Sequence, residues 1–202
     1  MTTFMFDRIL CITNRALCPD DFLTQLARVA AARPAAIVLR EKDLSETDYE
    51  ALAAQTLAIC RKADVPCVLH RYPAAARRLG CPAVHLPLPI LEADPDGARG
   101  FDTVGVSVHS VSEARRAQAL GATYLTAGHV FPTACKAGVP ARGLDFLRDV
   151  CAAVELPVWA LGGVTPENAP ACLSAGAAGV AVMSGLMTPD GLSRWLAESE
   201  KV

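Results

Sequence analysis

The sequence predicts a closed barrel of eight parallel β-strands, each followed by an α-helix. Three observations lead to this fold class. Short apolar runs alternate with Ala-rich helical stretches, the alternation repeats eight times, and eight nearly equal units fill all 202 residues without a linker. The runs lack a clean polar–apolar alternation, which is typical of parallel strands covered on both faces. We therefore predict a single (β/α)₈ TIM-barrel domain over residues 1–202, with an open doubly wound sheet as the alternative.

The eight predicted strands are Ile9–Thr13, Ala36–Leu39, Cys67–His70, Ala83–Leu86, Thr103–Val108, Tyr124–Ala127, Val158–Leu161 and Gly179–Val182. Helix signals lie between them. The pairs Ser45/Asp48 and Ser110/Glu113 have capping-box spacing, and Thr165-Pro166 predicts another helix start. Helix ends are predicted at Gly80, Gly121 and Gly176. The fourth unit is the weakest, because Pro87, Pro89, Pro95 and Gly97 follow its strand and predict a short or irregular helix.

Composition limits the function classes. Hydrophobic residues make up 52% of the chain and the formal net charge is −2 without a basic stripe, which argues against nucleic acid as a partner. No apolar run reaches the roughly 20 residues of a membrane span, and the N-terminus lacks the pattern of a secretory leader. We therefore expect no membrane association and a cytoplasmic location. The eight cysteines form no CxxC pair, so most are expected to be small buried hydrophobic residues rather than disulfides.

In such barrels the active site lies at the carboxyl ends of the strands. After strands seven and eight come Gly162-Gly163 and Met183-Ser184-Gly185. Glycines let a backbone approach a ligand closely, and a helix starting near Thr165 would aim its free N–H groups at the same place. These loops predict a phosphate cradle. The alternative is that the glycines only form tight turns.

Cations follow the second strand, where Arg40 and Lys42 bracket Glu41. Two cations at a strand end suit a carboxylate or a second phosphate, although a solvated charged loop is the alternative. Ser107, near the end of the fifth strand, and His70, at the end of the third, are candidate substrate contacts.

His129 is the sharpest catalytic candidate, because it follows the sixth strand and histidine can both take and give a proton near neutral pH. Thr133, Cys135 and Lys136 share its loop. A nucleophilic Cys–His pair is conceivable there, but no third orienting group is evident, so a thiol in contact with substrate is preferred. Of the remaining histidines, His85 suggests a core position and His109, just before a helix cap, a supporting one. We predict no metal site and no cofactor.

Six segments in chain order resemble the thiamine phosphate synthase superfamily. They are Leu39–Asp43, Val84–Leu86, Gly105–His109, Gly128–Thr133, Leu161–Asn168 and Val180–Ser184. The superfamily includes Mg²⁺-dependent synthases, which join a pyrimidine pyrophosphate to a thiazole phosphate. Their pattern has a Gln at the place of Val38, an Asn-Asp pair at His70-Arg71 and an Asp at Pro89. Both metal-ligand carboxylates are therefore missing here, and hard cations need oxygen ligands.

The thiazole tautomerase branch is the closer resemblance. Its loop after the sixth strand matches Gly128-His-Val-Phe131, Thr133, Cys135-Lys136, Gly138 and Arg142-Gly143. The resemblance implies that a carboxythiazole phosphate with an exocyclic double bond is aromatised by proton transfer, without a metal. It implies proton transfer by His129, phosphate binding by Gly162, Gly163, Met183 and Ser184, and closure over the phosphate by Lys136. Because no Mg²⁺-pyrophosphate then needs Arg40 and Lys42, we infer that these two cations face the carboxylate.

Two other functions remain open at this point. One is a synthase with an altered metal site, and the other is a non-catalytic binder of thiazole phosphate. In each case the expected partner is a small phosphorylated thiazole. The sequence leaves a homodimer open.

Overall fold

The computed structural model describes residues 6–136 and 138–199, in which eight strands form a closed, parallel barrel in chain order. This confirms the predicted fold. The strands are β1 (Ile9–Ile12), β2 (Ala36–Leu39), β3 (Cys67–His70), β4 (Ala83–Pro87), β5 (Thr103–Val108), β6 (Tyr124–Gly128), β7 (Val158–Leu161) and β8 (Gly179–Val182). Every predicted strand is present, and no boundary differs by more than one residue. Residues 1–5, where no leader was predicted, lie outside the described residues.

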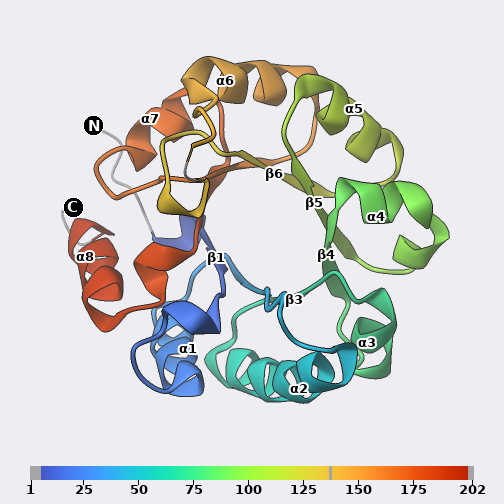
Figure 1. Cartoon of the computed structure of the whole chain (residues 1–202), viewed down its shortest axis with the longest axis vertical. Coiled ribbons are helices and arrows are strands. Elements are labelled where there is room, and N and C mark those ends of the chain that lie inside the picture. The colour runs from blue at the N-terminus through green and yellow to red at the C-terminus, as the bar shows by residue number, and fades with distance from the viewer. Residues whose placement is uncertain (1–5, 137, 200–202) are drawn as a thin grey trace. The chain divides into compact units, whose positions relative to one another are not determined.

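Figure 1 shows that a helix follows each strand along the chain. The helices are α1 (Phe22–Ala31), α2 (Glu46–Ala63), α3 (Pro73–Arg78), α4 (Leu88–Ala93), α5 (Val111–Ala119), α6 (Gly143–Ala153), α7 (Ala169–Ser174) and α8 (Pro189–Ser199). Short 3₁₀ turns are η1 (Phe6–Arg8), η2 (Arg15–Leu17), η3 (Asp96–Ala98), η4 (Ala134–Lys136) and η5 (Ser184–Leu186). As predicted, the fourth unit has a short helix of 6 residues followed by a 3₁₀ turn. No helix in the described part of the chain is both long and apolar enough to cross a membrane.

By their internal contacts, the described residues form two compact units. The first contains residues 6–84 and 182–199, and the second contains residues 85–136 and 138–181. In the first unit, the core includes Ile9, Leu26, Ile37 and Leu69, which are fully buried. In the second, Leu91, Leu125, Leu147 and Val180 have the same role. The single domain over residues 1–202 stays a prediction.

Two of the predicted helix starts are capped as expected. The Ser45 hydroxyl accepts the Asp48 N–H at 3.1 Å, and the Ser110 hydroxyl accepts the Glu113 N–H at 3.1 Å. The Glu113 carboxylate reaches one residue further back than a capping box requires, to the His109 N–H at 2.6 Å. The predicted helix ends at Gly80, Gly121 and Gly176 also hold, since all three have a positive φ.

The predicted helix start at Thr165-Pro166 is wrong. Helix α7 begins at Ala169 and has only 6 residues. The reason is a local competition between a side chain and the helix. The Asn168 carboxamide accepts the Thr165 N–H at 2.8 Å and donates to the Gly163 carbonyl at 3.0 Å. These bonds close a turn before the helix and occupy the Thr165 N–H. This N–H is therefore not one of the free groups that were predicted to face a phosphate.

Candidate functional site

His129 directly follows β6 and is buried, with 7% of its surface exposed. Its ring nitrogen Nε2 lies 3.1 Å from the Val139 carbonyl oxygen. A carbonyl oxygen can only accept a hydrogen bond, so Nε2 carries the proton in the neutral ring. The other nitrogen, Nδ1, then has its lone pair available. The structure thus gives His129 one nitrogen that anchors the ring and one that can take a proton.

Backbone hydrogen bonds hold the segment around His129 past the end of β6. On one side, the Val130 N–H donates to the Leu161 carbonyl at 2.9 Å and the Phe131 N–H to the Gly162 carbonyl at 3.0 Å. On the other side, the Arg142 N–H donates to the His129 carbonyl at 3.0 Å. The main chain of His129 is therefore fixed by two neighbouring segments, although the residue lies outside a regular strand.

Gly162 and Gly163 make this arrangement possible. Both have a positive φ, of +97° and +66°. A Cβ added to Gly162 would collide with the Cβ of His129, and one added to Gly163 would lie 2.7 Å from the Phe131 carbonyl oxygen. The two glycines thus allow the end of β7 to pack directly against the segment that carries His129. Their predicted role in phosphate binding stays a prediction.

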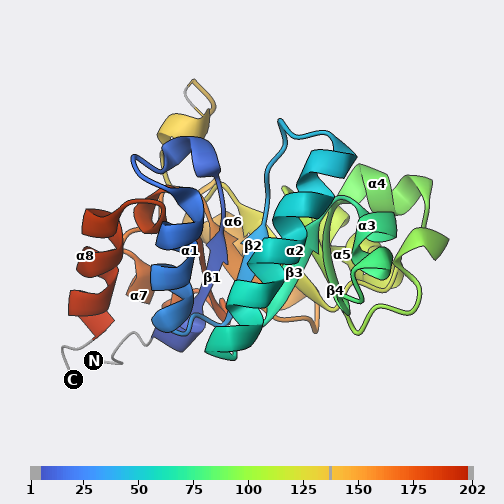
Figure 2. The ribbon, with the colours of Figure 1, turned by 90° about the horizontal axis from the view of Figure 1, so that it is seen from below.

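The loop after His129 contains the other predicted residues of this unit. Thr133 is half-buried, whereas Cys135 and Lys136 are exposed on η4. Figure 2 shows this turn standing away from the strands of its own unit. The Lys136 N–H donates to the Thr133 carbonyl, and the Val139 N–H to the Lys136 carbonyl, each at 3.0 Å. The described bond of the His129 ring goes to Val139 and not to Cys135, so the geometry does not support a nucleophilic pair. A substrate contact of the Cys135 thiol stays a prediction.

Ser107 belongs to a network of polar groups inside the second unit. Its hydroxyl lies 2.8 Å from His85 Nε2 and accepts the Thr126 hydroxyl at 3.1 Å. The other ring nitrogen of His85 lies 2.8 Å from the Tyr124 hydroxyl. Burial raises the pKa of Tyr124, so this phenol stays protonated over the physiological range. His85 is thus a satisfied core histidine, as the sequence suggested, and it fixes a predicted substrate contact.

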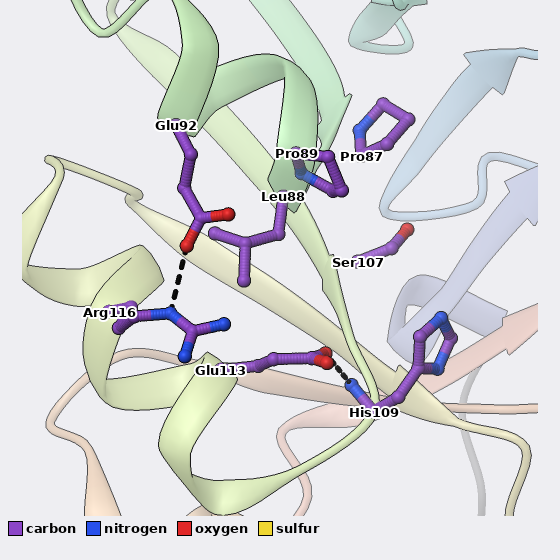
Figure 3. A pocket seen from close by; sticks show the side chains of 8 residues that line it. All are labelled: Pro87, Leu88, Pro89, Glu92, Ser107, His109, Glu113 and Arg116. Atoms are coloured by element: carbon purple, nitrogen blue, oxygen red, sulfur yellow. Dashed lines mark hydrogen bonds and ion pairs between the residues drawn. The ribbon is translucent and has the colours of Figure 1, made fainter.

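A cavity of about 230 Å³ opens beside Ser107 at the ends of β4 and β5. Figure 3 shows the lining side chains, which are Pro87, Leu88, Pro89, Glu92, Ser107, His109, Glu113 and Arg116. Its two carboxylates are already engaged. Glu92 pairs with Arg116 at 2.8 Å, and Glu113 accepts the His109 N–H. Apart from Ser107, these residues were not predicted as substrate contacts.

In the first unit, the predicted cations Arg40 and Lys42 flank a buried carboxylate. Glu41 is 2% exposed, accepts the Thr13 hydroxyl at 2.7 Å and accepts the Arg15 N–H at 3.1 Å. The Thr13 hydroxyl in turn accepts the Arg40 N–H at 2.9 Å. Glu41 therefore joins the end of β2 to the end of β1, which explains why this charged segment is not simply a solvated loop.

The remaining predicted residues of the first unit follow β3 and β8. His70 is buried, and its N–H donates to the Tyr49 hydroxyl at 2.7 Å. Met183 is half-buried, and its Sδ lies 4.0 Å from an Arg40 guanidinium nitrogen. Ser184 is exposed and begins η5. The first unit thus brings Arg40 to the residue that follows β8.

Residues 9–186 match the family model described as thiamine monophosphate synthase. The chain belongs to this family.

Relatives and solved structures agree with this assignment. The chain is 36% identical over 183 residues to a thiamine-phosphate synthase of Alcanivorax borkumensis, covering 88% of this chain and 84% of the relative. It is 36% identical over 184 residues to a thiamine-phosphate synthase of Methanocella arvoryzae, covering 89% and 86%. The structure of a thiamine phosphate pyrophosphorylase from Pyrococcus furiosus superposes with a TM-score of 0.80 at 27% identity, covering 96% and 94%.

These matches confirm the superfamily predicted from the sequence, but not the tautomerase branch. The relatives named above are synthases, so the names favour the alternative prediction over the main one. The roles of the individual site residues stay predictions.

Proposed function

We propose that this member of the thiamine monophosphate synthase family is a thiazole tautomerase that acts in thiamine biosynthesis. The observation that carries the proposal is the orientation of His129. Its Nε2–H is held by the Val139 carbonyl, which leaves Nδ1 as the base. Isomerisation of a carboxythiazole phosphate to the aromatic thiazole needs one proton removed and one delivered. A positioned imidazole performs both steps, since it is an acid once it has been a base.

In the proposed reaction, Nδ1 of His129 takes the proton from the ring carbon that bears the carboxylate. The electron pair of the broken C–H bond forms a new ring double bond, and the existing ring C=N bond shifts to the ring carbon that carries the exocyclic double bond. The electrons of the exocyclic double bond move to the exocyclic carbon. The imidazolium returns a proton to that carbon, which restores the neutral ring. Throughout, the Nε2–H remains bonded to Val139, and this bond becomes stronger while the ring is charged.

The other site residues are proposed to position the substrate. Gly162, Gly163, Met183 and Ser184 would bind the phosphate, and Lys136 would close over it. Arg40 reaches Met183, so we propose Arg40 for the phosphate and Lys42 for the carboxylate. Ser107, Thr133, Cys135 and His70 would contact the remaining parts of the molecule.

A synthase is the second candidate, supported by the names of the relatives. The family's synthases imply Mg²⁺, and the described carboxylates nearest the predicted site do not fit it. Glu41 bonds to Thr13, just after β1, and to Arg15 of η2, which also bonds to Asp43. Glu92 pairs with Arg116. At the strand 3 end, Arg71 would repel a cation, and hard cations require oxygen ligands.

One pair of assays on the purified protein decides between the candidates. Aromatisation of the carboxythiazole phosphate is followed by its ultraviolet spectrum in the presence of a chelator. Condensation of the pyrimidine pyrophosphate with thiazole phosphate is followed with Mg²⁺ present. Aromatisation without condensation is the expected result. Robust condensation without aromatisation would replace our proposal with the synthase, and tight product binding without either turnover would replace it with a binder.

A further inference from the structure

The carbonyl group of Gly128 lies in the peptide unit that joins β6 to His129, and two side chains donate to it. His109 Nδ1 lies 2.7 Å from this oxygen and Arg142 Nε lies 3.2 Å from it. Since the carbonyl can only accept, His109 carries its proton on Nδ1. The shorter of the two bonds comes from His109, for which the sequence predicted only a supporting position.

The His109 backbone is held in turn by the first turn of α5. The His109 N–H donates to the Glu113 carboxylate at 2.6 Å, and the Glu113 N–H donates to the Ser110 hydroxyl. Figure 3 shows Glu113 and His109 side by side at the cavity, joined by this bond. The rigid start of a helix thus fixes the backbone of His109, and His109 fixes the peptide unit before His129.

We propose that His109 is a positioning residue for His129. Rotation of the Gly128–His129 peptide unit would move the His129 ring away from the Val139 carbonyl, because the backbone of His129 sets the direction of its side chain. Together with Arg142 Nε, the His109 donor opposes this rotation and keeps Nδ1 of His129 directed at the substrate. The catalytic part of this proposal rests on the proposed function, but the geometric part does not.

Asn and Gln at position 109 form a matched pair of variants, because they carry the same side-chain amide and differ only in the length of the side chain. In His109→Asn, the amide nitrogen stands about where Nδ1 stands in histidine and keeps the donor. In His109→Gln it lies one carbon further out. His109→Leu removes the donor altogether. Arg116→Ala is the control, because Arg116 lines the same cavity but pairs with Glu92. Thermal unfolding of each variant checks that it folds.

The first measurement is the ¹⁵N spectrum of the His129 side chain, identified among the 4 histidines by its loss in His129→Gln. Wild type, His109→Asn and Arg116→Ala should show the neutral Nε2–H tautomer. His109→Gln should show a mixture of tautomers, as should His109→Leu if it folds. Unchanged His129 signals in folded His109→Gln would overturn the proposal, whatever the protein catalyses.

The second measurement is aromatisation kinetics. We expect kcat of His109→Gln to fall by about tenfold to a hundredfold, since misplacing a catalytic group by about 1 Å has effects of that size. Its KM should stay near the wild-type value, and His109→Asn should recover most of kcat. A fall in kcat with unchanged His129 signals would overturn the positioning role. If wild type lacks aromatisation but the tautomer responds as expected, the proposed function fails and the positioning role stands.

Discussion

His85 and His129 are both buried in the second unit, with 3% and 7% of their surfaces exposed, yet their rings have different kinds of partner. The two ring nitrogens of His85 face the hydroxyls of Tyr124 and Ser107, each at 2.8 Å. A hydroxyl can donate or accept, so either tautomer of His85 is satisfied. His129 faces a carbonyl, which fixes its tautomer. The partner's chemistry, and not burial, thus separates a structural histidine from a candidate base.

The largest expected effect tests this difference directly. His129→Gln keeps an N–H that can reach the Val139 carbonyl but removes the base, so kcat for aromatisation should fall by about a hundredfold to ten-thousandfold. The matched variant His85→Gln disturbs Ser107 instead and should act mainly on KM. Steady-state kinetics of both variants measures the effects. Equal losses of kcat would show that the two histidines are not functionally distinct.

The next effect concerns the close packing of Gly162 against the His129 side chain. Gly162→Ala adds a Cβ that collides with His129, whereas Gly121→Ala adds one at a similar φ, +90°, with no atom within 4 Å. Gly121→Ala should cost about 1 kcal/mol of unfolding free energy, from backbone strain alone. Gly162→Ala should cost about 2 kcal/mol more, because of overpacking. Urea unfolding gives both values, and equal costs would mean that the backbone yields without strain.

The smallest expected effect is on stability and concerns the hydrogen bond between His85 and Tyr124. Tyr124→Phe removes a hydrogen-bond partner of His85 and should cost about 1 kcal/mol at neutral pH. Burial raises the pKa of Tyr124, whereas in the unfolded chain a phenol ionises near pH 10. The stability from the neutral phenol is therefore complete below about pH 10 and is lost as the pH rises further. The Phe variant should lose less stability between neutral and alkaline pH, and parallel curves would contradict the buried phenol.

The strands could be predicted from the sequence almost residue by residue, because Ile, Val, Leu and Ala buried on both faces leave a strong signal. The site could be predicted only in part. His129 and the glycines stand out by type and place, but the atom that orients His129 is a backbone carbonyl, which any residue at position 139 would supply. Glu41 carries a charge and its partners lie 26–28 positions away, so no local pattern reveals its burial.

The backbone next to His129 and the loop that holds its ring should differ in amide exchange rate. The Val130 and Phe131 amides donate to the carbonyls of Leu161 and Gly162 at the end of β7, and amides bonded in this way exchange slowly with solvent. The ring, however, is tied to Val139, which is 51% exposed in a segment of mostly exposed residues. Amide exchange should therefore be slow at Val130 and Phe131, which follow His129, and fast near Val139, which holds the His129 ring. Local opening of the loop would release the imidazole while leaving the barrel strand intact.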